Sequence, residues 1–173
     1  MDNCRTLLTM LKLTFDTQCL RYLDPDHRSP LFVIEMTELM SLAEQGLIDA
    51  VRVGTIVKKD LMGDPARLAE REQLIDGLPV KNLAGVMVLG EWELGRDVVA
   101  SDEAEEVLGP QSELSRKVDE RDRLHLRAHR AHSRDIFVTT DSGILKASVL
   151  LASADIRVMT PDEALGVVQA SLA

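Results

Sequence analysis

The stretch Ile136-Phe137-Val138-Thr139-Thr140-Asp141 decides the fold that this sequence predicts. Its β-branched and aromatic residues are typical of a buried strand, and an aspartate closes it. The stretch Leu11-Lys12-Leu13-Thr14-Phe15-Asp16 has the same form. Open α/β sheets place their ligands beyond the carboxyl ends of the strands. We therefore expect the carboxylates of Asp16 and Asp141 to face one common site.

Between and beyond these two stretches, strand-like and helix-like segments alternate along the chain. The predicted strands are residues 11–15, 48–53, 135–140 and 156–159. The predicted helices are residues 31–45, 55–74, 112–132, 142–152 and a last helix opened by the capping box Thr160-Pro161-Asp162-Glu163. This alternation predicts an α/β fold in which helices cover both faces of a central, mostly parallel sheet, giving three layers in the order α/β/α.

Apolar spacing and turn residues set the expected limits of two of these helices. The helix over residues 31–45 should end at Gly46, and Ser112 is the expected N-cap of the helix over residues 112–132. The apolar markers of the first of these helices are Leu31, Ile34, Leu39 and Leu42. Their spacing is typical of an amphipathic helix.

The composition fits one ordinary globular domain. The chain has 173 residues, of which 45% are apolar and 28% charged, so we treat residues 1–173 as a single domain. Residues 78–111 fit the alternation poorly and are interpreted as an insertion, either a hairpin or a contact with a partner. Cys4 and Cys19 have no metal-ligand spacing and make no disulfide framework, which favours a reducing, cytoplasmic location. No signal peptide or membrane-spanning segment is predicted.

One segment reverses the charge of an otherwise acidic chain. The formal net charge is −9, but residues 116–134 hold seven Lys and Arg against three Asp and Glu, a local net charge of +4. One interpretation is a solvated helix face, since charged segments usually are. The other is a basic helix that holds the phosphate backbone of RNA, with Arg123, Arg127 and Arg130 as the phosphate contacts.

Four aspartates are the candidate metal ligands and catalytic residues: Asp16, Asp60, Asp122 and Asp141. If they converge, they form an oxygen-rich pocket suited to Mg²⁺ or Mn²⁺. A bound divalent ion neutralises the charge of a phosphodiester and lowers the pKa of a bound water, which is the chemistry of a metal-dependent nuclease. Asp60 is either a ligand or an acid that orients water from outside the ligand shell. Thr140 and Ser142 could add hydroxyl groups beside Asp141.

Each acid also has a structural interpretation. Asp141 precedes Ser142-Gly143 at a helix start, where aspartate is a favoured N-cap. Asp122 could pair with neighbouring arginines, and Lys58 and Lys59 could balance Asp60. Asp16 is the hardest to explain this way, because a carboxylate at the end of a buried strand is costly without a partner.

Histidines raise a zinc alternative. At helical spacing, one face carries Asp122, His125, His129 and His132, and zinc accepts histidine and carboxylate ligands. Three histidines along one straight helix cannot easily surround a single ion, because each residue adds about 1.5 Å of rise. We expect instead that His125 packs near the acids, and that His129 and His132 face solvent or RNA.

The C-terminal half of the chain resembles a PIN domain. In that family an aspartate opens a helix of pattern D-x-x-H-L-x-A, and the next strand ends in V-T-x-D. The matching residues here are Asp122-Arg123-Leu124-His125-Leu126-Arg127-Ala128 and Asp135-Ile136-Phe137-Val138-Thr139-Thr140-Asp141. In the N-terminal half, Leu13-Thr14-Phe15-Asp16-Thr17 resembles the first strand and first acid of the family, and residues 53–61 resemble the exit of its second strand. The resemblance covers about residues 11–160, and residues 78–111 match least.

The resemblance implies a Mg²⁺- or Mn²⁺-dependent ribonuclease with the four aspartates as its site. Many bacterial members are toxins of toxin–antitoxin modules, so a cognate antitoxin and a homodimer are implied partners. Two residues depart from the family pattern: Gln18, where Asn is usual, and Asp60, where Glu is usual. They favour an alternative, a non-catalytic PIN-like module that acts through protein contacts at residues 78–111. A nucleotide-binding Rossmann-like domain is disfavoured, since no G-x-G-x-x-G follows the first strand.

Overall fold

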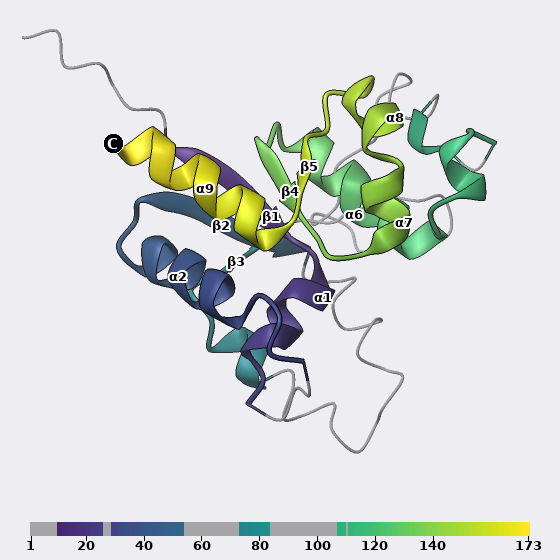
Figure 1. Ribbon diagram of the computed structural model, residues 1–173. Coiled ribbons are helices and arrows are strands. Elements are labelled where there is room, and N and C mark those ends of the chain that lie inside the picture. Colours follow the sequence, from purple (N-terminus) through teal and green to yellow (C-terminus); the bar gives the residue numbers. More distant parts are fainter. Residues whose placement is uncertain (1–9, 26–28, 54–72, 84–106, 110) are drawn as a thin grey trace, which may run out of the picture.

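The computed structural model describes residues 10–25, 29–53, 73–83, 107–109 and 111–173, and these form an α/β fold (Figure 1). The described strands are β1 (Leu11–Phe15), β2 (Ile48–Val53), β3 (Lys81–Leu83), β4 (Ile136–Val138) and β5 (Val158–Met159). They make one sheet in the order β3-β2-β1-β4-β5, and every pairing is parallel. The predicted α/β class with a parallel sheet is confirmed.

The direction of the chain across the sheet reverses at β1. From β1 the chain adds β2 and then β3 on one side, and it returns to add β4 and β5 on the other. Leu13 of β1 lies opposite Ala50 of β2 and Ile136 of β4. In open α/β sheets, the crevice beyond the carboxyl ends of two such strands is where ligands bind. The residues that follow β1 and β4 therefore occupy the position where a site is expected.

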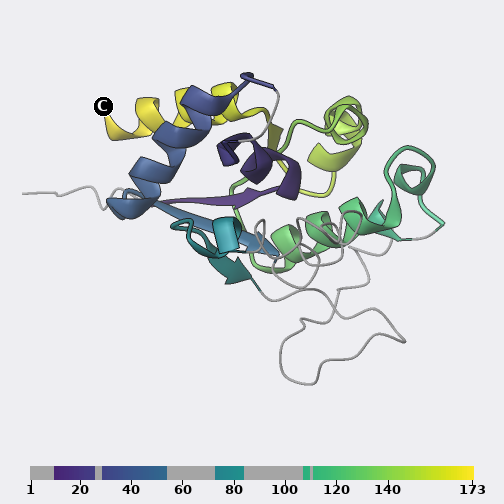
Figure 2. The ribbon, with the colours of Figure 1, turned by 90° about the horizontal axis from the view of Figure 1, so that it is seen from below.

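Helices lie on both faces of this sheet. The described helices are α1 (Thr17–Leu20), η1 (Arg21–Leu23), α2 (Val33–Glu44), η2 (Leu114–Arg116), α6 (Glu120–Ala131), α7 (Ser142–Lys146), α8 (Ser148–Ala152) and α9 (Pro161–Leu172). Seen from below, α2 and α9 lie side by side on one face and α6 lies on the other (Figure 2). None of the helices in the described ranges is long and apolar enough to cross a membrane.

Alternation along β1 divides the buried residues between the two faces. Leu13 and Phe15 enter the core under α2, where Met36 and Leu39 pack against them. Thr14 points to the other face, toward α6. On that side a second cluster gathers around Phe137, and Leu108 belongs to it. The range 78–111, interpreted from the sequence as an insertion, thus contributes to the fold where it is described. Residues 81–83 form strand β3, and Leu108 is buried.

The start of α2 differs from the prediction. The helix begins at Val33, after Phe32 adopts a left-handed backbone conformation with φ 59°. The side chains of Leu31 and Ile34 are exposed, whereas Met36, Leu39 and Met40 are buried. The first two members of the apolar pattern, Leu31 and Ile34, therefore lie outside the core. Gly46, with φ 69°, ends the segment as predicted, because glycine adopts this conformation without a steric cost.

Two other helix limits also differ from the prediction. The helix predicted from Ser112 begins at Glu120, because the side chain of Asp119 accepts the backbone N–H of Asp122 and caps α6. The helix predicted over residues 142–152 is divided at Ala147 into α7 and α8. The capping box at Thr160 is confirmed, with the side chain of Glu163 accepting the N–H of Thr160 at 3.0 Å.

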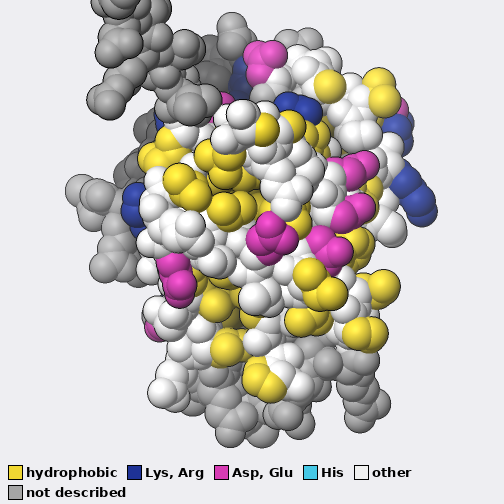
Figure 3. Space-filling view, turned by 60° about the vertical axis from the view of Figure 1, so that its left-hand side comes forward, with side chains coloured by type: hydrophobic (Ala, Val, Ile, Leu, Met, Phe, Trp, Pro, Cys, Tyr) yellow, Lys and Arg dark blue, Asp and Glu magenta, His cyan; other side chains and the backbone are white. Residues whose placement is uncertain are grey.

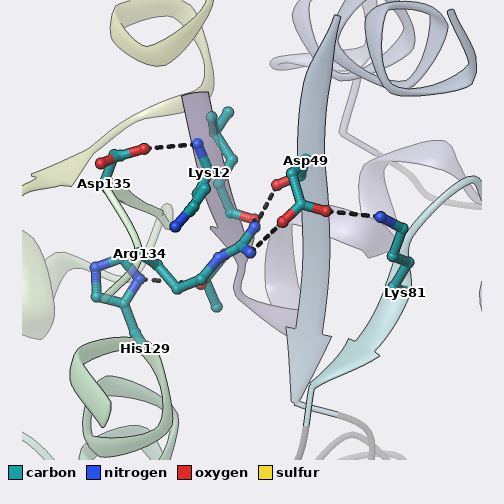
Figure 4. A network of polar contacts seen from close by, with 8 residues as sticks. Lys12, Asp49, Lys81, His129, Arg134 and Asp135 are labelled. Atoms are coloured by element: carbon teal, nitrogen blue, oxygen red, sulfur yellow. Dashed lines mark hydrogen bonds and ion pairs between the residues drawn. The ribbon is translucent and has the colours of Figure 1, made fainter. Parts of the chain in front are cut away.

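A polar network joins the amino-terminal ends of the strands, opposite the carboxyl ends where a site is expected (Figure 4). The guanidinium of Arg134 donates to the carboxylate and the carbonyl of Asp49 and to the carbonyl of Leu13. Lys81 binds the other oxygen of Asp49 at 2.9 Å. Burial alone would raise the pKa of Asp49, but Lys81 and Arg134 hold it below its ordinary value. The network joins β1, β2, β3 and the segment before β4.

Candidate functional site

Asp16 follows β1 directly and is almost fully buried. Its Oδ2 accepts a hydrogen bond from the hydroxyl of Thr139 at 2.6 Å. The same hydroxyl oxygen accepts the backbone N–H of Asp141 at 3.0 Å. Thr139 therefore links the acid after β1 to the acid after β4. Sequence reasoning selected Thr140 and Ser142 as hydroxyl donors and missed this residue, although it stands two positions before Asp141 at the end of the strand.

Asp141 is the N-cap of α7. Its Oδ1 accepts the backbone N–H groups of Gly143 at 2.7 Å and Ile144 at 3.0 Å, so the structural interpretation of this residue is realised. A Cβ atom on Gly143 would lie 2.9 Å from that oxygen and 3.2 Å from the carbonyl oxygen of Lys117. The second oxygen, Oδ2, makes no hydrogen bond to any described residue. Asp141 can thus cap the helix and still offer one oxygen to a ligand.

Asp122 lies in the first turn of α6 and is half-buried. Its carboxylate has no hydrogen bond or ion pair with the described residues, so the predicted pairing with neighbouring arginines is not formed among them. Burial, together with the negative charges of Asp119, Asp16 and Asp141, raises the pKa of Asp122 to about 7, and the charge of His125 acts in the opposite direction. The charges of Asp16 and Asp141 therefore reach the carboxylate of Asp122. A buried carboxylate among like charges favours a cation or a proton.

The fourth predicted acid, Asp60, lies outside the described residues. Within the described ranges, no group of three or more His, Cys, Asp or Glu side chains is arranged to hold a metal ion. Among the described residues, the carboxylate of Asp122 and Oδ2 of Asp141 form no hydrogen bond, so both can serve as ligands of a cation. This donor set has the chemistry that Mg²⁺ prefers, because that ion commonly keeps several waters and binds through one or two carboxylates and a substrate phosphate.

Two of the three predicted phosphate contacts donate to backbone carbonyl groups of residues 108–109. Arg123 donates to the carbonyl of Gly109 at 2.7 Å, and Arg127 donates to the carbonyl of Leu108 at 3.3 Å. Arg127 is buried, so its guanidinium fastens residues 108–109 to α6 instead of extending into solvent. Arg130 is only half-buried. The exposed basic residues within six sequence positions of Asp122 or Asp141 are Arg116, Lys117, Arg121 and Lys146.

His129 does not face solvent or RNA, as the sequence had suggested. It is fully buried between α6 and the sheet, where Nδ1 lies 2.9 Å from the hydroxyl of Thr14. Its ring meets that of Phe137 edge-on, with centroids 5.6 Å apart. Burial and, to a smaller extent, the positive charge of Arg134 lower the pKa of His129 to about 3. His129 is therefore a neutral core residue, which removes it from the zinc alternative.

No known protein family, curated protein or solved structure matched this chain in the comparisons that were made. The functional argument therefore rests on the geometry of the three acids and on the residues that hold them.

Proposed function

We propose that this chain is a Mg²⁺- or Mn²⁺-dependent endoribonuclease of the PIN type. The observation that supports this most is the position of Asp122. Its carboxylate is half-buried, forms no hydrogen bond or ion pair with a described residue, and lies close enough to Asp16 and Asp141, which follow β1 and β4, for their charges to raise its pKa. Such a charge is costly without compensation, so the carboxylate favours a proton or a cation. In this proposal the compensating group is a divalent cation.

Each of the three acids has a different task in this proposal. Asp16 is fixed by Thr139, so its orientation is set before a ligand arrives. Asp141 is fixed by the backbone of α7 and presents Oδ2. Asp122, with a pKa of about 7, can hold or release a proton at its free carboxylate near neutral pH. A divalent ion bound here would neutralise phosphate charge and acidify a water molecule.

Exposed basic residues in the segments that carry Asp122 and Asp141 favour binding of an anionic substrate. Arg121 is next to Asp122 in the first turn of α6, and the backbone carbonyl of Lys117 approaches Gly143 beside Asp141. In this proposal Arg121 takes the place of Arg123 and Arg127 in meeting the RNA backbone, since the side chain of Lys117 forms an ion pair with Glu113 at 2.8 Å. Under the same proposal, a cognate antitoxin is the partner that would restrain the activity in the cell.

A cleavage assay on single-stranded RNA tests the proposal. Wild-type protein should cleave with Mg²⁺ or Mn²⁺, and chelation with EDTA should stop it. Asp16→Asn and Asp122→Asn keep the side-chain shape but remove a negative charge, so each should lower the rate by about two orders of magnitude or more. The matched control is Asp135→Asn, because Asp135 lies at the amino-terminal edge of the sheet and bonds the N–H of Lys12. The control should cleave like wild type.

Cleavage that survives both EDTA and Asp122→Asn would sink the proposal. A second candidate function is the non-catalytic module, and one observation favours it: Asp16 and Asp141 each already use an oxygen within the fold. That candidate predicts no cleavage of any RNA offered. It also predicts that Mg²⁺ raises the melting temperature of wild type no more than that of Asp122→Asn.

A further inference from the structure

The outer surface of α2 and α9 has acidic side chains without basic partners. The two helices carry five of them: Glu35, Glu38, Glu44, Asp162 and Glu163. Neither helix contains a Lys or Arg, and none of the five carboxylates forms an ion pair with a described residue. The hydrogen bond from Gln169 to Glu38, at 2.8 Å, joins the two helices without a charge. This surface thus carries an uncompensated negative field.

Exposed apolar side chains lie on the same surface. Ile34 is 77% exposed and Leu31 is 62% exposed, at the start of α2. Figure 3 shows this side of the molecule, where acidic and apolar side chains lie among one another and Lys and Arg appear toward the margins. The sequence has the apolar spacing of a buried helix face here, yet the fold leaves its first two members uncovered.

The backbone at this point indicates that the exposure is built in. Phe32 adopts a left-handed conformation, which bulky side chains rarely do. Its ring turns inward and meets Tyr22 edge-on at 5.8 Å. Leu31 and Ile34, on either side of it, are left outside as a consequence. Strained residues of this kind cluster where a surface has a role beyond stability.

We infer that the face formed by α2 and α9 docks a basic, amphipathic helix of a partner protein. The apolar side of such a helix would cover Leu31 and Ile34, and its Lys and Arg would meet the unpaired carboxylates. Nucleic acids and anionic membranes are repelled by this face, because they carry the same sign of charge as its carboxylates. The inference is independent of the proposed nuclease site, which lies at the crevice beyond β1 and β4.

The test uses a defined probe, a labelled amphipathic peptide of about 18 Leu and Lys residues, long enough for five helical turns. Two controls accompany it: a Leu–Glu peptide of the same pattern, and a Leu–Lys peptide of the same composition in scrambled order. Fluorescence anisotropy measures the dissociation constant of each for the full chain. The patterned Leu–Lys peptide should bind at least about tenfold more tightly than either control, and its affinity should fall as salt rises from about 0.05 M to about 0.5 M.

Matched variants locate the binding face. Ile34→Ser should weaken binding of the patterned peptide at least about tenfold, because one buried aliphatic side chain is lost from the contact. Val149→Ser is the control, since Val149 on α8 is 84% exposed and lies outside this face. Glu35→Gln should weaken binding more than Asp155→Asn, although each removes one negative charge from the chain.

Three results would overturn the inference. The first is equal binding of the patterned and scrambled peptides, which would mean attraction to net charge alone. The second is equal loss with Ile34→Ser and Val149→Ser. The third is a dimer of the free chain, measured by sedimentation, that Ile34→Ser dissociates, because the face would then be covered by a second copy.

Discussion

At the scale of single residues, two buried titratable groups act on stability with opposite signs. The pKa of Asp122 is raised to about 7, so the folded state holds its proton more tightly than the unfolded state does. The effect of Asp122 on the free energy of unfolding is therefore most favourable below about pH 4, and stability falls as pH rises from about 4 to about 7. The pKa of His129 is lowered to about 3, so its contribution is complete above about pH 6.5 and is lost as pH falls toward 3. Between about pH 4 and about pH 6.5, a rise in pH thus lowers stability through Asp122 and raises it through His129.

Asp122→Asn should therefore change the shape of the stability profile. Asparagine never ionises, so the variant should be more stable than wild type by about 1–2 kcal/mol at about pH 8, a figure reduced for partial exposure of the carboxylate. At about pH 4 the two proteins should be nearly equal. Because Asp122→Asn removes the effect of Asp122, the unfolding free energy of the variant should rise with pH through the effect of His129. Urea unfolding at both pH values measures this.

The control for this prediction is Glu44→Gln, at an exposed carboxylate of α2 without a described partner. It should leave the difference in unfolding free energy between the two pH values as it is in wild type. An Asp122→Asn protein that is less stable than wild type at the higher pH would contradict the raised pKa.

At the scale of elements, the start of α7 depends on a close approach that only glycine permits. Asp141 caps the helix through the N–H groups of Gly143 and Ile144, and the carbonyl of Lys117 closes over the same turn. The turn connects β4 to α7 and fixes one of the three acids. An element of five residues thus serves both the helix start and the candidate site.

Gly143→Ala should destabilise the protein, because the added Cβ would lie 2.9 Å from Oδ1 of Asp141. The expected cost is about 1–3 kcal/mol of unfolding free energy. Gly166→Ala is the matched control, since a Cβ there meets nothing within 4 Å in the middle of α9. Alanine favours a helix interior over glycine, so the control should gain about 0.5–1 kcal/mol. Equal effects in thermal unfolding would mean that the turn tolerates a side chain.

At the scale of the whole molecule, one buried ion pair holds distant parts of the chain together. Arg134 and Asp49 are 85 positions apart in sequence, and their contact joins the segment before β4 to the start of β2 (Figure 4). Lys81 adds β3 to the same carboxylate. Since the candidate site lies at the other end of these strands, the network supports the sheet without taking part in the chemistry.

Arg134→Met should cost about 3–5 kcal/mol, because it leaves the carboxylate of Asp49 without its buried partner. Lys81→Met should cost less than about 1 kcal/mol, since Lys81 is exposed. Combining Arg134→Met with Asp49→Asn should cost less than the two separate losses added together. Strict additivity in a double-mutant cycle of denaturant unfolding would argue that the pair does not interact.

The sequence by itself determined the elements whose signals are local. The strands at 11–15 and 48–53, the capping box at Thr160 and the parallel sheet follow from β-branched runs and from alternation between strands and helices. The convergence of Asp16 and Asp141 follows from the same logic, because parallel strands end at one edge. What the sequence did not predict was β3, whose three residues, Lys81–Leu83, have little apolar pattern.

Only the tertiary structure decided how individual polar and apolar side chains are used. His129 is buried because Thr14, 115 positions away, lies within hydrogen-bonding distance of its ring. Arg127 turns inward because the carbonyl of Leu108 lies beside it, and Ile34 stays outside because no described element covers it. Such outcomes depend on which distant segments meet, and helical periodicity reports only the face that a residue occupies. The environment on that face comes from the packing of the whole chain.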